Sequence, residues 1–212
     1  ISERKKYGLG DPSDQTISLQ STLQVLKEKF DETHGGTQRA PKFPMPSLWE
    51  FCMRAAQATK DEAALNHVWL TLEKMAKGGI YDQIGGGFAR YSVDGQWFAP
   101  HFEKMLYDNG QLISLYSKAY QLNPNPLFKN VVYETIAWMK REMRHPSGAF
   151  YAALDADTEG EEGKFYTWTY EELAEIVSNE MPWLSKLYNL KPSGNWEEGV
   201  NILFQTQSYD EV

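Results

Sequence analysis

The side chains best suited to acid–base chemistry are one histidine and four aspartates in or beside three long glycine-containing segments. They are His101, Asp82, Asp108, Asp155 and Asp157. Imidazole and carboxyl groups are common general acids and bases, and neighbouring charges can raise the pKa of a carboxyl group toward neutrality. Their distribution predicts a site assembled from several loops.

His101 precedes a predicted helix that begins near residue 103. At a helix N-terminus the dipole disfavours the protonated imidazole, so a neutral His101 could act as a general base or hydrogen-bond donor. The alternative is that His101 only caps the helix. Lys104 and Asp108 are four residues apart, which predicts that they share one helix face. They are candidates for substrate binding and catalysis respectively, although a buried ion pair between them is the favoured interpretation.

Asp155 and Asp157 begin an acidic segment that is predicted to form the tip of a wide β-hairpin. With Glu159 and Gly160 they match the beginning of a calcium loop, but the twelfth position is Tyr166 and no helix pair flanks the segment. We therefore predict no metal site, and no motif indicates a cofactor. A catalytic carboxylate pair and a solvated turn that hydrogen-bonds backbone amides are both open interpretations.

Aromatic residues accompany these groups in the second long segment. Phe88, Tyr91 and Trp97 could stack on the apolar face of a sugar ring, and Arg90 could bind its hydroxyl groups or a carboxylate. Tyr81, beside Asp82 at the glycine turn, is a further candidate for substrate binding. The alternative for the three rings is packing of a β-hairpin, and it is favoured for two of them.

Six predicted helices carry these segments. The first, third and fifth have a single apolar stripe, whereas the second, fourth and sixth are apolar on most faces. This alternation predicts an outer and an inner layer of helices, which is an α/α toroid, mostly all-α, with small β-hairpins in its long loops. The predicted helices cover about residues 16–34, 47–56, 61–77, 103–122 and 127–144, with a shorter one from 169.

The connections between these helices alternate in length. Links from inner to outer helices are short, at 57–60 and 123–126, whereas outer-to-inner links are long and contain a glycine turn. The three long loops should therefore emerge at one end of the toroid, where binding residues are commonly found. Residues 1–15 are predicted to be a lead-in, and residues 16–212 a partial toroid of about three helical hairpins.

Composition excludes several classes of protein. The 212 residues carry a net charge of −8, which gives no electrostatic basis for binding nucleic acid. No apolar run is long enough to span a membrane. The single cysteine, Cys52, excludes an internal disulfide and favours a reducing compartment such as the cytoplasm, although a signal upstream of this sequence is compatible with these features.

Four segments together resemble one known family. They are 35–44 (GGTQRAPKFP), 79–88 (GIYDQIGGGF), 100–109 (PHFEKMLYDN) and 154–157 (LDAD). The sequence is similar to the family of bacterial YyaL-type proteins and spermatogenesis-associated protein 20. The resemblance implies an N-terminal thioredoxin-like domain in the parent chain, followed by a region similar to six-hairpin glycosidases and N-acylglucosamine 2-epimerases. This chain resembles the first part of that helical region.

These observations support two functional hypotheses. The first is a carbohydrate-active toroid that binds a sugar at its long-loop end. His101 would then be the base for epimerisation or isomerisation, with an acid drawn from Asp82, Asp108 or Asp155, or two of these carboxylates would hydrolyse a glycoside. The second is a non-catalytic scaffold that presents partner proteins to the thioredoxin-like domain. We also expect exposed apolar surface on the inner helices to favour self-association.

Overall fold

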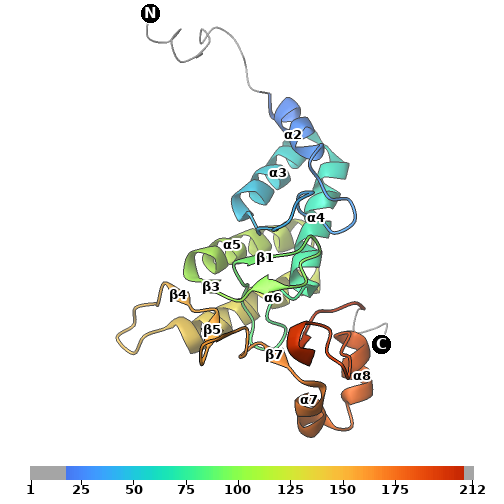
Figure 1. Cartoon of the computed structure of the whole chain (residues 1–212). Helices are drawn as coiled ribbons and strands as arrows, with labels where there is room; N and C mark the ends of the chain where they lie inside the picture. Colours follow the sequence, from blue (N-terminus) through green and yellow to red (C-terminus); the bar gives the residue numbers. More distant parts are fainter. Residues whose placement is uncertain (1–17, 208–212) are drawn as a thin grey trace, which may run out of the picture.

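The computed structural model describes residues 18–207, so the predicted lead-in, residues 1–15, lies outside the described residues. Five α-helices form the main body (Figure 1). The Ser18, Asp61 and Asn125 side chains cap three of them by accepting hydrogen bonds from backbone amides. The helices are α2 (Leu19–Lys27), α3 (Pro46–Thr59), α4 (Glu62–Lys77), α5 (Leu106–Leu122) and α6 (Pro126–Trp138), and α6 continues into the π-helix η1 (Met139–Met143).

The helices pack in the two predicted layers. α3 and α4 form one antiparallel hairpin, and α5 and α6 form the next. Between the hairpins, α3 packs against α5 and α4 packs against α6, while α2 lies on α3. This arrangement gives one row with α3 and α5 and another with α4 and α6, as expected for part of an α/α toroid.

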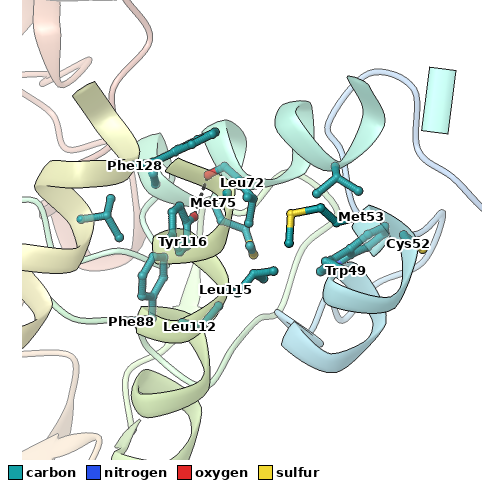
Figure 2. Packing of buried hydrophobic residues seen from close by; sticks show 14 of the residues in the cluster. Trp49, Cys52, Met53, Leu72, Met75, Phe88, Leu112, Leu115, Tyr116 and Phe128 are labelled. Carbon is teal, nitrogen blue, oxygen red and sulfur yellow. Dashed lines mark hydrogen bonds between the residues drawn. The ribbon is translucent and has the colours of Figure 1, made fainter. Parts of the chain in front are cut away.

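A continuous apolar core holds the hairpins together (Figure 2). Leu115 and Tyr116 of α5 meet Leu72 of α4, and the Tyr116 hydroxyl donates to the Leu72 carbonyl oxygen at 2.7 Å. Trp49 and Met53 extend this core along α3. Each fully buried side chain of this size contributes about 1.5–3 kcal/mol, so the core supplies a rigid base for the loops.

Short antiparallel strand pairs join the long loops at one end of the helical body. In the second loop, Tyr91 pairs with His101, and the first loop reaches it through a bridge between Lys42 and Ser92. The second loop pairs with the third through Lys104 and Leu154. The predicted convergence of the three loops is therefore confirmed. The pairs are β1 (Tyr91–Ser92) with β2 (Pro100–His101), β3 (Lys104–Met105) with β4 (Ala153–Leu154), β5 (Asp157–Thr158) with β6 (Glu161–Glu162), and β7 (Thr167–Trp168) with β8 (Asn201–Ile202).

The C-terminal part forms a small lobe beside the main body (Figure 1). It contains α7 (Tyr170–Val177), α8 (Met181–Leu187) and the 3-10 turn η2 (Glu197–Gly199). The capping box predicted at the start of α7 is present, formed by Thr169 and Glu172. The expectation that this sixth helix belongs to the inner layer is wrong, because α7 is short, buries only Leu173, and packs against α8 in a separate apolar cluster.

Two helix boundaries differ from the sequence prediction. The first helix ends at Lys27 rather than near residue 34, because residues 30–37 form a hydrogen-bonded loop. The fourth helix begins at Leu106, because the preceding residues 100–105 are extended and pair with other strands. Between residues 18 and 207, no helix is both long and apolar enough to cross a membrane.

Candidate active site at the loop end of the toroid

The extended segment Pro100–Met105 determines where the candidate residues lie. Successive side chains of an extended chain point to opposite faces, and burial alternates here accordingly. His101 and Glu103 lie on the more exposed face, whereas Phe102 and Lys104 are buried on the other. The predicted position of His101 at a helix N-terminus is therefore wrong, and so is a shared helix face for Lys104 and Asp108.

His101 is held by carboxylates from two different loops. Its Nδ1 lies 2.7 Å from Oε1 of Glu162 in β6, and its Nε2 lies 3.9 Å from Oε2 of Glu103. Arg90 approaches the same Glu103 oxygen, with Nη1 at 2.9 Å. The charges of Arg90 and Glu103 also act on Asp108. We call Arg90, His101, Glu103, Asp108 and Glu162 the loop-end cluster.

The contact with Glu162 determines which nitrogen of His101 is available. An ionised carboxylate can only accept hydrogen bonds, so Nδ1 must be the donor in this pair. In the neutral imidazole the proton therefore lies on Nδ1, and Nε2 carries the free lone pair. This is the arrangement of an oriented general base.

Asp108 supplies a carboxyl group with a perturbed pKa. Burial raises the pKa of Asp108; the charge of Arg90 partly opposes this shift and that of Glu103 adds to it. Among residues 18–207, no group donates a hydrogen bond to its carboxylate. A half-buried carboxyl group that keeps its proton to higher pH is suited to act as a general acid.

Aromatic rings border the loop-end cluster. The Tyr91 ring stacks on His101, with centroids 5.1 Å apart and planes inclined by 24°. Phe43 of the first loop packs on Tyr91 at 4.8 Å and is 47% exposed. Tyr107 at the start of α5 is also exposed. Of the predicted binding residues, Arg90 and Tyr91 therefore lie with the acid–base groups.

Asp82 and Lys104 form a separate buried ion pair. Lys104 Nζ lies 2.8 Å from Asp82 Oδ2 and donates to the Gly86 carbonyl oxygen at 2.9 Å. Asp82 Oδ1 accepts hydrogen bonds from the amides of Ile84 and Gly85. Burial lowers the pKa of Lys104, and the Asp82 charge opposes that shift. The predicted Lys104–Asp108 pair is therefore replaced by a Lys104–Asp82 pair.

The same arrangement occurs in the first loop. Lys42 Nζ lies 2.6 Å from Asp31 Oδ2 and donates to the Gly35 carbonyl oxygen at 2.7 Å. Asp31 likewise accepts hydrogen bonds from two turn amides that follow it, and the Lys42 ammonium lies over Trp97 as that of Lys104 lies over Trp138. We call each unit an Asp–Lys staple.

The occurrence of the same Asp–Lys staple in two loops indicates what Asp82 and Lys104 do in the second loop. The two units share one structural task, because each staple closes a glycine turn around a buried lysine. All hydrogen bonds of Asp82 serve this turn. These contacts give Asp82 and Lys104 a structural role, and because both residues also line a cavity, catalysis by Asp82 and substrate binding by Lys104 stay predictions.

Other predicted residues are buried away from the cluster. Phe88 and Trp97 are completely buried in the core, so the expectation that they stack on a sugar is wrong. Their apolar rings instead fill the space around the glycine turns, where a Cβ on Gly36 would meet Trp97. Tyr81 is also buried, and its hydroxyl donates to Glu134 at 2.6 Å. Burial raises the pKa of Tyr81, so its hydroxyl stays protonated.

Asp155 and Asp157 lie at the exposed base of the acidic hairpin. Asp155 Oδ1 accepts a hydrogen bond from the Asp157 amide at 3.3 Å, as in the solvated-turn interpretation. The hairpin contributes Glu162 to the cluster instead of either aspartate. Within the described part of the chain, no three His, Cys, Asp or Glu side chains are placed to hold a metal ion.

A cavity of about 530 Å³ lies on the other face of Pro100–Met105. Phe102 and Lys104 form part of its wall, together with Arg141 and Glu142 of η1 and Tyr166 of the third loop. None of the five residues of the loop-end cluster lines it. The predicted residues are thus divided between two faces of one extended segment.

Sequence reasoning missed Glu103 and Glu162 as members of the cluster. Glu103 lies within a segment, PHFEKM, in which buried and exposed residues alternate with a period of two. That period is the signal of a strand, and it places His101 and Glu103 on one face. No local signal identifies Glu162, because its contact with His101 spans 61 residues.

Comparison with solved structures supports the class of fold. The cellobiose 2-epimerase from Bacillus thermoamylovorans superimposes with a TM-score of 0.56 at 14% identity, over 70% of this chain and 43% of that protein. A sugar epimerase from a ruminal bacterium superimposes with a TM-score of 0.56 at 15% identity, over 82% of this chain and 53% of that protein. The chain therefore has the fold of part of an α/α toroid of the six-hairpin type. No family model matches the chain.

Sequence comparison identifies the relatives. Human spermatogenesis-associated protein 20 is 37% identical over 216 residues, which cover 91% of this chain and 27% of that protein. The mouse protein is 37% identical over 187 residues, which cover 82% of this chain and 24% of that protein. The chain is thus homologous to spermatogenesis-associated protein 20 over about nine tenths of its sequence, and it spans about a quarter of the length of these curated relatives.

Proposed function

We propose that the loop-end cluster is the acid–base site of a carbohydrate-active domain that epimerises or isomerises a sugar. The observation that carries the proposal is the His101–Glu162 contact, because it fixes an imidazole with a free Nε2. Glu103 connects this imidazole to Asp108, since it lies 3.9 Å from His101 Nε2 and its charge raises the pKa of Asp108. The two superimposed sugar epimerases have the same fold, which supports this substrate class.

The reaction requires one proton acceptor and one proton donor next to a sugar carbonyl group. His101 Nε2 would take the proton from the carbon beside the carbonyl, which leaves an enediolate. Asp108, protonated to higher pH than an ordinary aspartate, would return a proton to the same carbon in epimerisation. In isomerisation it would protonate the adjacent carbon, and the hydroxyl proton would move from one enediolate oxygen to the other as the new carbonyl group forms. Arg90 would stabilise the negative charge that develops on oxygen, and the Tyr91 and Phe43 rings would contact the apolar face of the sugar.

Hydrogen exchange with solvent tests the chemistry whichever sugar is the product. The full-length protein is incubated in D₂O with a panel of reducing hexoses, N-acetylhexosamines and uronic acids, and deuterium at C2 is measured by mass spectrometry. We expect incorporation into at least one sugar, and its loss in His101→Gln and Asp108→Asn. Absence of both exchange and binding across the panel would refute the proposal and favour a protein-interaction role.

Glu162 provides a sharper test of how the site is organised. Glu162→Gln removes the charge that holds the Nδ1 proton, so we expect ¹⁵N chemical shifts of His101 to lose their Nδ1–H preference and the exchange rate to fall. Glu161→Gln is the matched control, because Glu161 is the adjacent residue of the same strand and faces Lys164 instead. Equal effects of the two variants would contradict a positioning role for Glu162.

A further inference from the structure

The 530 Å³ cavity lies where the helical body meets the C-terminal lobe. Its walls come from the second loop and η1 of the body, and from Tyr166, Trp168 and Leu203 on the lobe side. The volume falls within the range of small-molecule sites, and such sites often lie between structural units. The cavity is separate from the loop-end cluster, and its use does not depend on the function proposed above.

Three carboxylates line the cavity, and two of them, Glu142 and Asp82, accept hydrogen bonds at both oxygens. Glu142 Oε2 accepts from Trp138 Nε1 at 3.0 Å, and Oε1 accepts from Arg141 Nε at 3.0 Å. Both oxygens of Asp82 accept hydrogen bonds within its staple. The third, Glu172, accepts hydrogen bonds from Thr169 through Oε2 alone, so within residues 18–207 Oε1 of Glu172 is the carboxylate oxygen of the wall that is not engaged.

Unused donors remain in the same wall. Arg141 uses Nε and Nη2 for Glu142 and the Gly85 carbonyl oxygen, whereas its Nη1 contacts no acceptor between residues 18 and 207. The Tyr166 hydroxyl also has no hydrogen-bond partner within that range. Burial raises the pKa of Tyr166, so this hydroxyl remains a donor. A complementary ligand must therefore bring acceptor oxygens.

Several of the apolar side chains in the lining are strongly exposed. Ile84 from the second loop is 63% exposed, and Phe165 from the third loop is 61% exposed. Phe102 lines the interior. Large apolar side chains that stay in water around a concave site indicate that something apolar contacts them.

We propose that this cavity binds a small monocarboxylate with an apolar body. The carboxylate accepts hydrogen bonds from Arg141 Nη1 and the Tyr166 hydroxyl, and the apolar body lies against Ile84 and Phe165. A single negative charge fits the wall better than a phosphate dianion, because each of its three cations already has an anionic partner. Lys104 pairs with Asp82, Arg141 with Glu142 and Lys164 with Glu159, and Glu172 adds a further negative charge. Carboxylate recognition by the planar guanidinium of arginine is a common mode of binding.

Phenylacetate and its neutral analogue phenylacetamide test the proposal by NMR titration of the chain. We expect saturable phenylacetate binding with a dissociation constant of about 1 mM or tighter, and phenylacetamide at least about tenfold weaker. Arg141→Gln should weaken phenylacetate binding about tenfold, since it removes the charged donor. Phe165→Ala should weaken both ligands. Arg144→Gln is the matched control, because Arg144 is an exposed arginine three residues away and outside the cavity wall.

Three outcomes would overturn the proposal. They are no saturable binding of phenylacetate, equal binding of the amide, and equal effects of Arg141→Gln and Arg144→Gln. Circular dichroism melts of each variant separate lost binding from lost folding. His101→Gln should bind phenylacetate normally, so failure of the sugar-exchange experiment and failure of this titration are distinguishable.

Discussion

Replacing the buried lysine of an Asp–Lys staple tests whether these units hold the loop end of the toroid. Lys104→Met keeps the aliphatic stem and removes the ammonium group. The variant leaves the Asp82 carboxylate without its cation and the Gly86 carbonyl oxygen without its donor. The side chains of Lys104 and Asp82 are only 2% and 15% exposed, so water cannot fully replace these contacts.

The expected loss follows from burial. Removing one partner of a buried ion pair destabilises a protein by about 3–5 kcal/mol, because the other charge stays buried and unpaired. We expect this range for Lys104→Met, and a similar loss for Lys42→Met because its staple has the same contacts. Lys118→Met is the control: its pair with Glu50 has side chains that are 36% and 29% exposed, and such pairs contribute about 0–1 kcal/mol.

Urea unfolding followed by circular dichroism measures the difference. With a slope of about 2 kcal/mol per molar urea, a loss of about 3–5 kcal/mol lowers the midpoint by about 1.5–2.5 M. Adding Asp82→Asn to Lys104→Met should restore part of the loss, because it removes the unpaired charge. The reasoning is refuted if Lys104→Met behaves like Lys118→Met, or if the losses from Lys104→Met and Asp82→Asn simply add in the double variant.

Three further predictions concern the site and the core. Asp108→Asn should raise stability at pH 7 but not at pH 3. Burial raises the pKa of Asp108 in the folded state, so the ionised carboxylate opposes folding only at pH values above the pKa that Asp108 has in the unfolded chain. Thermal melts at both pH values check this. Gly87→Ala should lower the free energy of unfolding by more than about 1 kcal/mol, because φ of Gly87 is +86° and a Cβ would lie 2.7 Å from Trp138. Gly110→Ala should raise it by up to about 1 kcal/mol, because a Cβ at this position of α5 meets open space. Urea unfolding measures both changes. Burial raises the pKa of Cys52 to about 12, so we expect iodoacetamide to label its thiol only after the chain unfolds. Mass spectrometry measures the labelling, and rapid labelling of the folded chain would contradict the burial of Cys52.

The layered helices could be predicted because their signals are local. The cap at Asp61, the proline near the start of α3 and the apolar periodicity of α3 to α6 all lie within the elements that they define. The meeting of the three loops was also predictable, because loop length alternates along the chain. The exception is the sixth helix, where apolar composition indicated an inner helix and the chain instead builds a separate lobe around Leu173.

The candidate site was less predictable because its partners are distant in sequence. Spacing alone suggested that Lys104 pairs with Asp108, but strand pairing of Lys104 with Leu154 turns its side chain toward Asp82. His101 meets Glu162 through a hairpin whose position depends on the whole third loop. Burial of Trp97 likewise follows from tertiary packing, which the residue types of the second loop do not encode.

The two Asp–Lys staples have a consequence for how the toroid can change over time. The two charges of each staple come from its own loop, whereas the ring that covers the lysine comes from another element, Trp97 of the second loop for Lys42 and Trp138 of α6 for Lys104. The charge pairing of one loop can therefore change without unpairing a charge in the next loop, although the shared core and the tryptophan rings still couple the hairpins. Substitutions in the residues between the staples can then alter what the loop end recognises while the frame that presents them stays intact.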